Sequence, residues 1–289
     1  MSLGKLDLRR TENIELGLLL DALKEGYGYD FSGYAPASLK RRLISLQRYF
    51  DVDHLADLIA TVLYDPTVAQ TVINSISVPA SDFFRDALVW KTVREVVLPK
   101  LSSFPRVNIW QAGCGHGEET YTLAILMREA GLEKRMRIFT SDINSSFLAE
   151  ARKGVWASNR MEAWRENYKK AGGCADFDHY FIERGDEIAI HDELKQSIEF
   201  VKHNLVVDEV FKEVQWVVCR NVLIYFNAEL QNKVVGLMSR SMERGAYLLL
   251  GRSERILDLP ETHPDLQELD AQVQLYRKTI GTFRSRGNA

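Results

Sequence analysis

Apolar residues near the start of the chain recur at the spacing of one helix face. In residues 13–25, Leu16, Leu19, Leu20 and Leu23 stand at i, i+3, i+4 and i+7, which predicts an amphipathic helix ended by Gly26 and Gly28. The same spacing predicts a second helix from Pro36 to residue 50. A third is expected after Asp53 as its N-cap, and a fourth follows the break at Asp65 and Pro66, over residues 68–76.

From residue 107 onward, short apolar runs alternate with helical stretches. Strands are predicted over residues 107–112, 136–141, 198–201, 214–219 and 246–251, with helices over 118–130 and from 147. This alternation predicts an α/β fold with a mostly parallel sheet and helices on both faces. Residues 157–195 are polar and contain Gly172, Gly173 and Gly185. They interrupt the alternation and predict an inserted subdomain.

Composition narrows the class of protein. Of 289 residues, 46% are hydrophobic and 27% charged, a balance typical of a chain with a buried core rather than a disordered, collagenous or coiled-coil one. The 37 basic and 40 acidic residues give a net charge of −3, which argues against nonspecific nucleic-acid binding. Neither an apolar run of membrane-spanning length nor a signal peptide is recognisable, so we expect a cytoplasmic protein without membrane insertion.

The three cysteines and six histidines do not form a metal-binding or disulfide pattern. Cys114, Cys174 and Cys219 include no C-x-x-C pair, and the histidines are scattered singly. We therefore expect no zinc site and no disulfide framework, and we expect the cysteines to be small buried residues.

A glycine-rich segment lies between the first predicted strand and the following helix. Gly113, Gly115 and Gly117 give G-x-G-x-G, whereas a dinucleotide fingerprint places its third glycine one residue later. Glu118 and Glu119 follow and would repel a pyrophosphate. They suit a ligand that carries positive charge, such as the amino group and sulfonium of S-adenosylmethionine. A glycine turn followed by helix-capping acids remains the structural alternative.

Three further positions end predicted strands or follow them closely. Asp142 ends the second strand, 25 residues after Gly117, where a carboxylate can accept both ribose hydroxyls of an adenosyl group; it could equally cap the next helix. Arg220 and Asn221 follow the strand over 214–219, at the edge where open α/β sheets bind ligands. Tyr225 comes within reach of the same edge, or packs as an aromatic residue beside Phe226.

Arginines form two other candidate features. Arg85 follows Phe83 and Phe84 where the helical region ends, and either contributes to the site or pairs with Asp82 or Asp86. In the second helix, Lys40, Arg41, Arg42 and Arg48 make the side opposite the leucines basic. That side is either a solvated helix face or a docking surface for an acidic protein partner.

These segments, taken together and in order, resemble the CheR family of chemotaxis receptor methyltransferases over residues 16–254. The resemblance is carried by FFR at 83–85, WQAGCGHGEE at 110–119, SDIN at 141–144, NL at 204–205, CRNVLIYF at 219–226 and GRSE at 251–254. It implies a small all-α N-terminal domain, residues 1–78, before a Rossmann-like S-adenosylmethionine-dependent methyltransferase domain, residues 79–289. A small inserted β subdomain is implied at about residues 157–197.

The resemblance also implies a reaction and a set of site residues. The family transfers a methyl group from S-adenosylmethionine to glutamate side chains in the cytoplasmic helical region of membrane chemoreceptors. The products are glutamyl methyl esters and S-adenosylhomocysteine, and no metal is involved. Carried over by position, the resemblance implies that Ser81 and Arg85 line the methionine end of the cofactor. Ala112, Gly113 and Glu118 would form the cofactor loop, with Glu118 on the amino group, and Asp142 would hold the ribose. Asn204 and Leu205 would flank the adenine, and Arg220, Asn221 and Tyr225 would lie near the reacting centre.

The chemistry needs few catalytic groups. A glutamate side chain with an ordinary pKa of about 4.3 is already ionised at neutral pH, so its attack on a methyl group needs no general base. Our hypothesis is that Arg85 and Tyr225 orient the substrate carboxylate. Correct positioning of the reacting groups can by itself lower the activation barrier substantially. Arg41 and Arg48, seven residues apart on one helix face, would steer an acidic receptor helix towards the enzyme.

Several positions depart from the family pattern, and alternatives remain. His116, Gly115, Thr120 and Pro79 differ from common family residues and indicate a divergent member. A divergent S-adenosylmethionine-binding signalling protein with another substrate, or without catalysis, is the main alternative. An NAD-dependent oxidoreductase would use a similar sheet, and a nucleic-acid methyltransferase commonly carries a D/N-P-P-Y/F motif, which this chain lacks.

Overall fold

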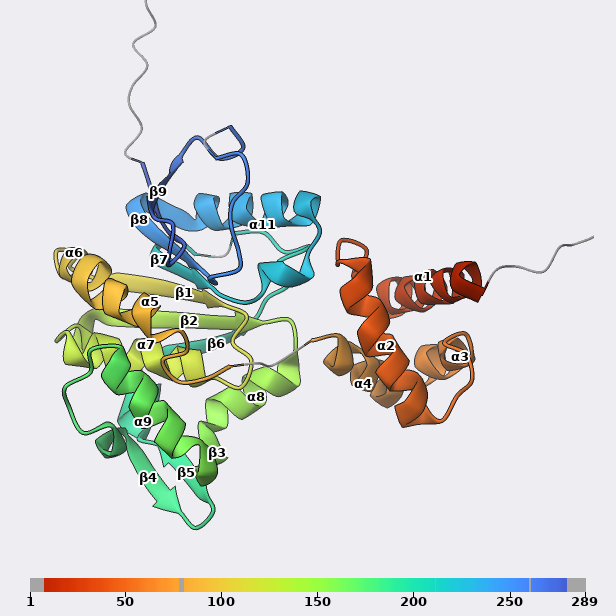
Figure 1. The fold of residues 1–289 in the computed structure, drawn as a ribbon, viewed down its shortest axis with the longest axis horizontal. Helices are drawn as coiled ribbons and strands as arrows, with labels where there is room; N and C mark the ends of the chain where they lie inside the picture. The colour runs from red at the N-terminus through yellow and green to blue at the C-terminus, as the bar shows by residue number, and fades with distance from the viewer. Residues whose placement is uncertain (1–7, 78–80, 211, 260, 280–289) are drawn as a thin grey trace, which may run out of the picture. The chain divides into compact units, whose positions relative to one another are not determined.

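The computed structural model describes residues 8–77, 81–210, 212–259 and 261–279. These residues form two units, one of residues 8–77 with 225–231 and one of residues 81–224 with 232–279. The helices of the first unit are drawn in red and orange in Figure 1. The sequence predicted the boundary near residue 78 but placed 225–231 in the second domain; the domain limits stay predictions.

The first unit consists of α1 (Leu8–Tyr27), α2 (Pro36–Phe50), α3 (Asp57–Tyr64) and α4 (Pro66–Ile76), together with residues 225–231. α1 continues through Gly26, and Gly28 follows it at φ +75°. The expected cap at Asp53 is wrong: α3 begins at Asp57, whose Oδ2 accepts the His54 backbone N–H at 3.0 Å. Asp65 caps α4 by accepting from the Thr67 N–H, which leaves Pro66 at a helical position that needs no donor.

Leucines and valines from all four helices fill the core of this unit. Leu19, Leu43, Val62 and Val72 have no more than 3% of their surface exposed. Residues 225–231 join the unit through backbone contacts: the Ala35 N–H donates to the Tyr225 carbonyl, and the Asn227 N–H to the Gly33 carbonyl, both at 2.8 Å.

The basic face of α2 is narrower than the sequence predicted. Arg41 and Arg48 are exposed, but Arg42 is buried, donates through Nη1 to the Ile76 carbonyl, and stacks over the Tyr225 ring at 4.3 Å from its centroid. Arg42 stands three positions after Leu39 and four before Leu46, both buried, and so on the packed side of the helix, where it helps to hold α4 and Tyr225.

A seven-stranded sheet forms the centre of the second unit. It is built from β1 (Val107–Ala112), β2 (Met136–Asp142), β6 (Ile198–Lys202), β7 (Val214–Cys219), β8 (Met242–Leu250), β9 (Leu266–Asp270) and β10 (Leu275–Lys278), in the order β6-β2-β1-β7-β8-β10-β9. Strands β6, β2, β1, β7 and β8 are parallel, as predicted, and β10 and β9 add antiparallel pairs at one edge. The strand order reverses at β1 and β7, where ligands bind in open α/β sheets.

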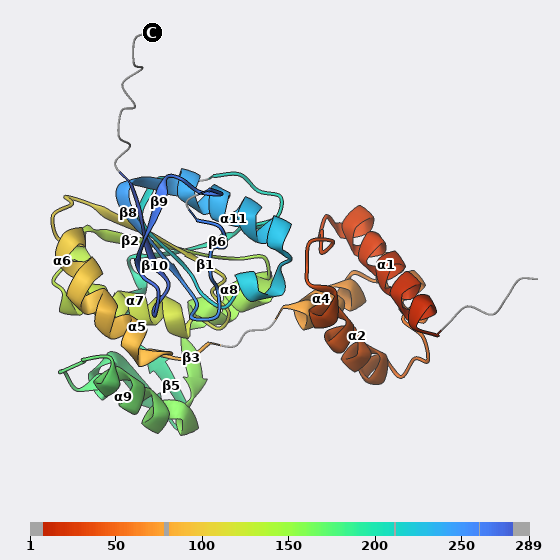
Figure 2. The same cartoon turned by 45° about the horizontal axis from the view of Figure 1, so that its top comes forward.

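Helices cover both faces of this sheet. α5 (Ala87–Thr92), the π-helical turn η1 (Val93–Val97), α6 (Leu98–Leu101) and α7 (Glu118–Glu129) lie opposite α11 (Ala228–Ser241), as Figures 1 and 2 show. α8 (Ser145–Lys153) follows β2, and α10 (Asp192–Lys195) precedes β6. Short 3₁₀ turns are η2 (Glu133–Arg135), η3 (Ser158–Arg160), η4 (Phe177–Tyr180) and η5 (Leu223–Tyr225).

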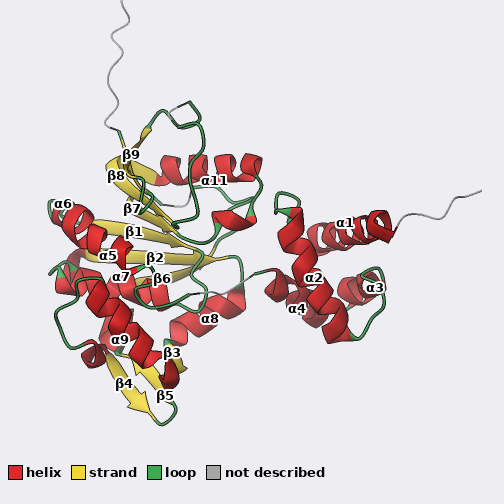
Figure 3. Cartoon of the chain, viewed as in Figure 1, coloured by secondary structure: helices red, strands yellow, loops and turns green. Residues whose placement is uncertain are grey.

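The predicted inserted subdomain is a separate small sheet with one helix. Strands β3 (Val155–Ala157), β5 (Glu187–Ile190) and β4 (Phe181–Arg184) pair antiparallel in that order, and α9 (Met161–Lys170) lies between β3 and β4 in the chain. Figure 3 shows this sheet apart from the central one. Its apolar residues Trp164, Tyr168 and Phe177 are buried, so the subdomain contributes to the main core rather than forming a polar loop.

The buried cysteines agree with the prediction only in part. Cys114 and Cys219 are buried, whereas Cys174 is exposed in the turn after α9. No helix among the described residues is long and apolar enough to cross a bilayer. Within the same described ranges, no group of three or more His, Cys, Asp and Glu side chains could hold a metal ion.

Candidate functional site

The glycine loop after β1 passes too close to its neighbours for other residues. A Cβ on Gly113 would lie 2.3 Å from Val222 Cγ2, and a Cβ on Gly117 would lie 2.9 Å from Ala151 Cβ. Both glycines have positive φ, +81° and +95°, a region that favours glycine. Ala112 is fully buried at the end of β1. The loop that follows it passes close to Val222, just after β7, and to Ala151 in the last turn of α8.

Glu118, the first residue of α7, has a carboxylate with one committed and one open oxygen. The side chain is 0% exposed, and Oε1 accepts from Arg160 Nη1 at 2.9 Å. Oε2 is buried and accepts no hydrogen bond from the residues that the structure describes. Burial raises the pKa of Glu118, while its own backbone N–H and, to a smaller extent, Arg160, His116 and the Ser81 hydroxyl lower it. None of the described residues donates a hydrogen bond to Oε2.

Asp142 at the end of β2 is held by the same loop. Its Oδ2 accepts the Gly115 N–H at 3.2 Å and its Oδ1 accepts the Asn144 N–H at 2.9 Å. Burial raises the pKa of Asp142, and these backbone donors lower it. Asn144, rather than Asp142, caps α8 by accepting from the Ser146 N–H. The Asp142 side chain is therefore fixed at the carboxyl edge of the sheet, and it remains partly exposed.

These groups fit a ligand such as S-adenosylmethionine. A buried carboxylate oxygen without a donor is costly unless a ligand supplies one, and an ammonium group would supply it at Glu118 Oε2. Asp142 retains lone pairs that can accept ribose hydroxyls. A pyrophosphate would place negative charge against the buried Glu118, so the donor set disfavours a dinucleotide.

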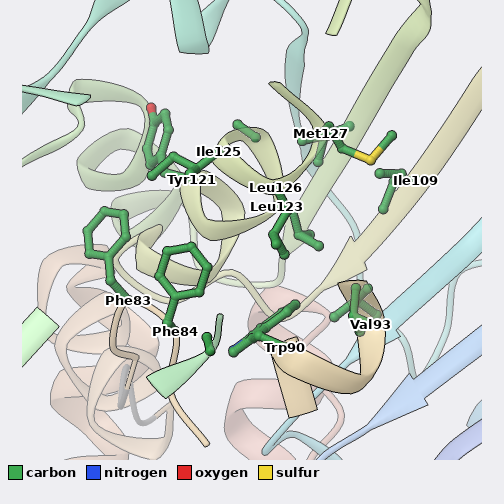
Figure 4. Close-up of a cluster of buried hydrophobic side chains, with 14 of the residues drawn as sticks. Phe83, Phe84, Trp90, Val93, Ile109, Tyr121, Leu123, Ile125, Leu126 and Met127 are labelled. Carbon is green, nitrogen blue, oxygen red and sulfur yellow. The ribbon is translucent and has the colours of Figure 1, made fainter. Parts of the chain in front are cut away.

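The segment before α5 is anchored by its aromatic residues. Phe83 and Phe84 are fully buried and point towards α7 in Figure 4. The Phe84 N–H donates to Thr122 Oγ1 at 3.1 Å, and Phe84 and Asp86 adopt φ of +50° and +57°, strained for non-glycine residues. Arg85, between them, is half-buried and is held in this fixed backbone.

The two acids beside Arg85 pair with other arginines. Asp82 Oδ1 accepts from Arg160 Nη2, and Asp86 Oδ2 accepts from Arg220 Nη2 at 2.7 Å. Arg220 also donates to Glu119 Oε2 at 2.6 Å and lies over the Trp90 ring, 5.1 Å from its centroid. The Arg220 side chain is 0% exposed. Its guanidinium therefore joins α7 to the Arg85 segment inside the protein.

Asn221 stands in a turn braced by Glu254. It adopts φ +60°, and its N–H donates to Glu254 Oε2 at 2.8 Å. The same carboxylate accepts the N–H groups of Gly251 at 2.6 Å and Ile224 at 3.2 Å. Burial raises the pKa of Glu254 and these donors lower it. Glu254 thus fixes the backbone that follows β7.

Asn204 and Leu205 lie in the turn after β6, both partly exposed. Asn204 Oδ1 accepts the Val206 N–H at 2.9 Å, and the Asn204 N–H donates to Asp208 at 2.8 Å. β6 is paired with β2, so this turn and Asp142 leave the sheet at the same edge. Arg41, Arg48 and Tyr225 belong to the first unit, where Tyr225 lies under Arg42.

The sequence analysis did not assign Arg160, Glu119 or Glu254 to the site. Arg160 comes from the inserted subdomain, 42 residues after Glu118, and its segment carries no motif. Glu254 belongs to the GRSE segment, which was noted without a role. Glu119 was considered only as a second acid beside Glu118. Counting the donors available to each buried carboxylate would have required the tertiary structure.

Comparison with known proteins covers both parts of the chain. The family model described as "CheR methyltransferase, SAM binding domain" matches residues 80–270, and "CheR methyltransferase, all-alpha domain" matches residues 14–77. The first of these supports S-adenosylmethionine as the cofactor.

Curated relatives match nearly their whole length. "Putative methyltransferase Cher3" of Pseudomonas putida is 37% identical over 270 residues, 93% of this chain and 98% of the relative. "Chemotaxis protein methyltransferase" of Listeria innocua is 31% identical over 238 residues, 82% and 88% of the two chains. Among solved structures, the N-methyltransferase NodS of Bradyrhizobium japonicum with S-adenosylhomocysteine aligns at a TM-score of 0.41 and 12% identity, over 70% and 90% of the chains.

The family models, the two relatives and the arrangement of an all-α unit before an α/β methyltransferase sheet agree with one another. They confirm the family and the fold class that the sequence motifs predicted: this chain is a methyltransferase that belongs to the CheR family.

Proposed function

We propose that this chain transfers a methyl group from S-adenosylmethionine to glutamate side chains of chemoreceptors, forming glutamyl methyl esters. The observation that carries the cofactor is Glu118, whose buried Oε2 accepts no hydrogen bond among the described residues and sits at the start of α7. The receptor substrate is supported by relatives named chemotaxis protein methyltransferases, including one that is 31% identical. A cytoplasmic location and the absence of a metal stay predictions.

In this reaction the residues of the chain would bind the cofactor, orient the substrate carboxylate and exclude water from both. Glu118 would bind the amino group, Asp142 the ribose hydroxyls, and the turn at Asn204 and Leu205 would flank the adenine, while the cofactor supplies a methyl group on a positively charged sulfur. No protein base is needed because the attacking carboxylate is already ionised. Positioning then supplies most of the rate enhancement.

Arg85 and Tyr225 are our candidates to orient the substrate carboxylate. Charge is neutralised as a carboxylate meets a sulfonium, so a tight arginine clamp would stabilise the ground state more than the transition state. Arg85 is held by strained neighbours, and the Tyr225 ring is held by Arg42, so both side chains start from restrained positions. Arg220 and Asn221 would position this segment, since both already hold internal partners.

Purified chain, radiolabelled S-adenosylmethionine and receptor-containing membranes test the reaction. We expect label in the receptor that base releases as methanol, because methyl esters are base-labile. Arg85→Ala and Tyr225→Phe, compared at S-adenosylmethionine concentrations at which each variant binds the cofactor, should lose most of the transfer, whereas Arg106→Ala, at an exposed position, should keep both binding and transfer. Near-normal transfer by both variants would remove their assigned role, and base-stable label would exclude glutamyl esters.

Receptor steering by α2 has its own test. The double variant Arg41→Glu/Arg48→Glu should raise KM for the receptor at low salt, and added salt should reduce the difference. Lys134→Glu/Arg137→Glu changes the charge equally at exposed positions of the second unit and should leave KM unchanged. An equal rise in KM for the two double variants would show that the net charge of the protein, and not the position of Arg41 and Arg48, affects receptor binding.

A further inference from the structure

Arg160 connects three parts of the second unit through one guanidinium. Nη1 donates to Glu118 Oε1 at 2.9 Å, and Nη2 donates to Asp82 Oδ1 at 2.6 Å and to the Ser81 carbonyl at 2.9 Å. Its plane lies over the Trp164 ring, 4.9 Å from the centroid. Trp164 itself donates to Asp82 Oδ1 at 2.6 Å. Arg160, at the start of the inserted subdomain, therefore holds both the cofactor loop and the segment that leads to Arg85.

The pairing is asymmetric at Glu118. Arg160 occupies Oε1, and Oε2 is left buried without a donor among the described residues. A carboxylate held by one bidentate arginine would have no such opening, and a carboxylate without Arg160 could rotate or take up a proton. The contact to Oε1 therefore restrains the rotation of the carboxylate and leaves one oxygen for a ligand.

We propose that Arg160 is a positioning residue for the cofactor, which orients Glu118 so that Oε2 receives the amino group of S-adenosylmethionine. The inference rests on the proposed cofactor. Besides its contribution to the hydrophobic core, the inserted subdomain then has a role in cofactor binding, because its first turn controls how firmly the amino end of the cofactor is bound. A purely structural tie would instead weaken every adenosyl ligand alike.

The first test compares two ligands that differ only in the amino group. Calorimetry with Arg160→Gln should show S-adenosylhomocysteine bound about tenfold more weakly or worse, the loss expected for a misplaced charged hydrogen bond. The deamino analogue, in which hydrogen replaces the α-amino group, should bind the variant and the wild type alike. Arg165→Gln is the matched control, because Arg165 lies on α9 and pairs with Asp178 away from Glu118; it should alter neither ligand.

The second test uses pH. Arg160 lowers the pKa of Glu118 against the effect of burial, so its removal raises that pKa, and a protonated Glu118 cannot pair with an ammonium group. Binding of S-adenosylhomocysteine to Arg160→Gln should therefore weaken as the pH falls towards mildly acid values, more steeply than in the wild type. The other titratable groups near Glu118 are His116, which pairs with Glu150 at 2.5 Å, the Cys114 thiol, and Asp82 across Arg160.

A double variant separates Glu118 from these neighbours. In Arg160→Gln/Glu118→Gln the additional pH dependence should disappear, and its affinity should equal that of Glu118→Gln alone, because Arg160 acts through Glu118. Arg160→Lys, which keeps the charge, should recover part of the affinity and serves if the glutamine variant does not fold. Equal losses for both ligands, or an unchanged affinity for S-adenosylhomocysteine, would overturn the proposal. A wild-type chain that binds neither ligand would instead refute the proposed cofactor.

Discussion

Glu118 and Glu119 are neighbours in the first turn of α7, and both are buried, yet the clusters around them differ. Glu118 shares Arg160 with Asp82, and that arginine side chain is 40% exposed. Glu119 shares Arg220 with Asp86, and the Arg220 side chain is 0% exposed. Of these two clusters, only that of Glu118 leaves a carboxylate oxygen buried and without a donor among the described residues; in the other, it is Arg220 Nε that lacks a partner.

The difference shows how a ligand site can be told from a structural ion pair. Burial alone does not separate the two glutamates, and neither does their position at a helix start. The number of donors that the fold supplies does separate them: an incompletely satisfied buried carboxylate is stable only when something else completes it. This difference supports our proposal that the Glu118 cluster binds a ligand and that the Glu119 cluster belongs to the scaffold.

The largest expected effect is on stability at the Glu119 cluster. Arg220→Met leaves Glu119 buried without its cation, and breaking such a pair costs about 3–5 kcal/mol of unfolding free energy. Urea unfolding followed by circular dichroism measures this loss. Arg160→Met should cost less, because the Arg160 side chain is 40% exposed and because burial already raises the pKa of Glu118, so the carboxylate left behind can take up a proton. The triple variant Arg220→Met/Glu119→Gln/Asp86→Asn should recover much of the loss, and equal costs for the two arginines would break the comparison.

An intermediate effect is expected on ligand affinity. Glu118→Gln should weaken S-adenosylhomocysteine by about one to two powers of ten, since a charged hydrogen bond is lost from a buried site. Glu119→Gln should lower stability and leave the affinity within a few-fold of the wild type. Calorimetry on both variants decides the matter, and a loss of affinity in Glu119→Gln as large as in Glu118→Gln would contradict the assignment.

The smallest effect is a pH dependence of stability without ligand. Burial raises the pKa of Glu118 above its ordinary 4.5, so the folded chain keeps this proton to higher pH than the unfolded chain, and stability falls as pH rises through that window. Glutamine does not titrate. The stability of Glu118→Gln relative to the wild type should therefore increase as pH rises from 4.5 towards neutral. A constant difference across that range would show that Glu118 is not perturbed by burial.

The fold was predictable where the hydrophobic pattern repeats over enough residues. Strands β1, β2, β6, β7 and β8 and helices α7 and α8 follow from apolar runs that must be buried in a parallel sheet and on the helix faces that cover it. The strands of the inserted subdomain were not predicted one by one, because their segment is mostly polar. β9 and β10 were missed because they have only five and four residues and are only partly buried, so their hydrophobic pattern is weak. Arg42 was assigned to the exposed side of α2, although it packs against Tyr225 and the end of α4.

The candidate site divides in the same way. The glycine loop, Asp142 and the turn after β7 could be placed together from sequence, because parallel strands end at one edge of a sheet. Arg160 and Glu254 could not, since each reaches its partner from a distant part of the chain. The resemblance assigned Glu118 to the amino group of the cofactor, but only the tertiary structure shows that Glu118 Oε2 lacks a donor among the described residues while Glu119 pairs with Arg220.

The amino-acid sequence by itself determined the order of helices and strands, the family and the residue types available for a cationic ligand. Periodicity and motif spacing are local properties, and they are sufficient for this. The tertiary structure alone decided that Arg220 and Glu119 close a buried pair while Glu118 keeps an oxygen open. That outcome depends on which long-range partners reach each buried charge, because the cost of burial is removed only by groups that lie within hydrogen-bonding distance.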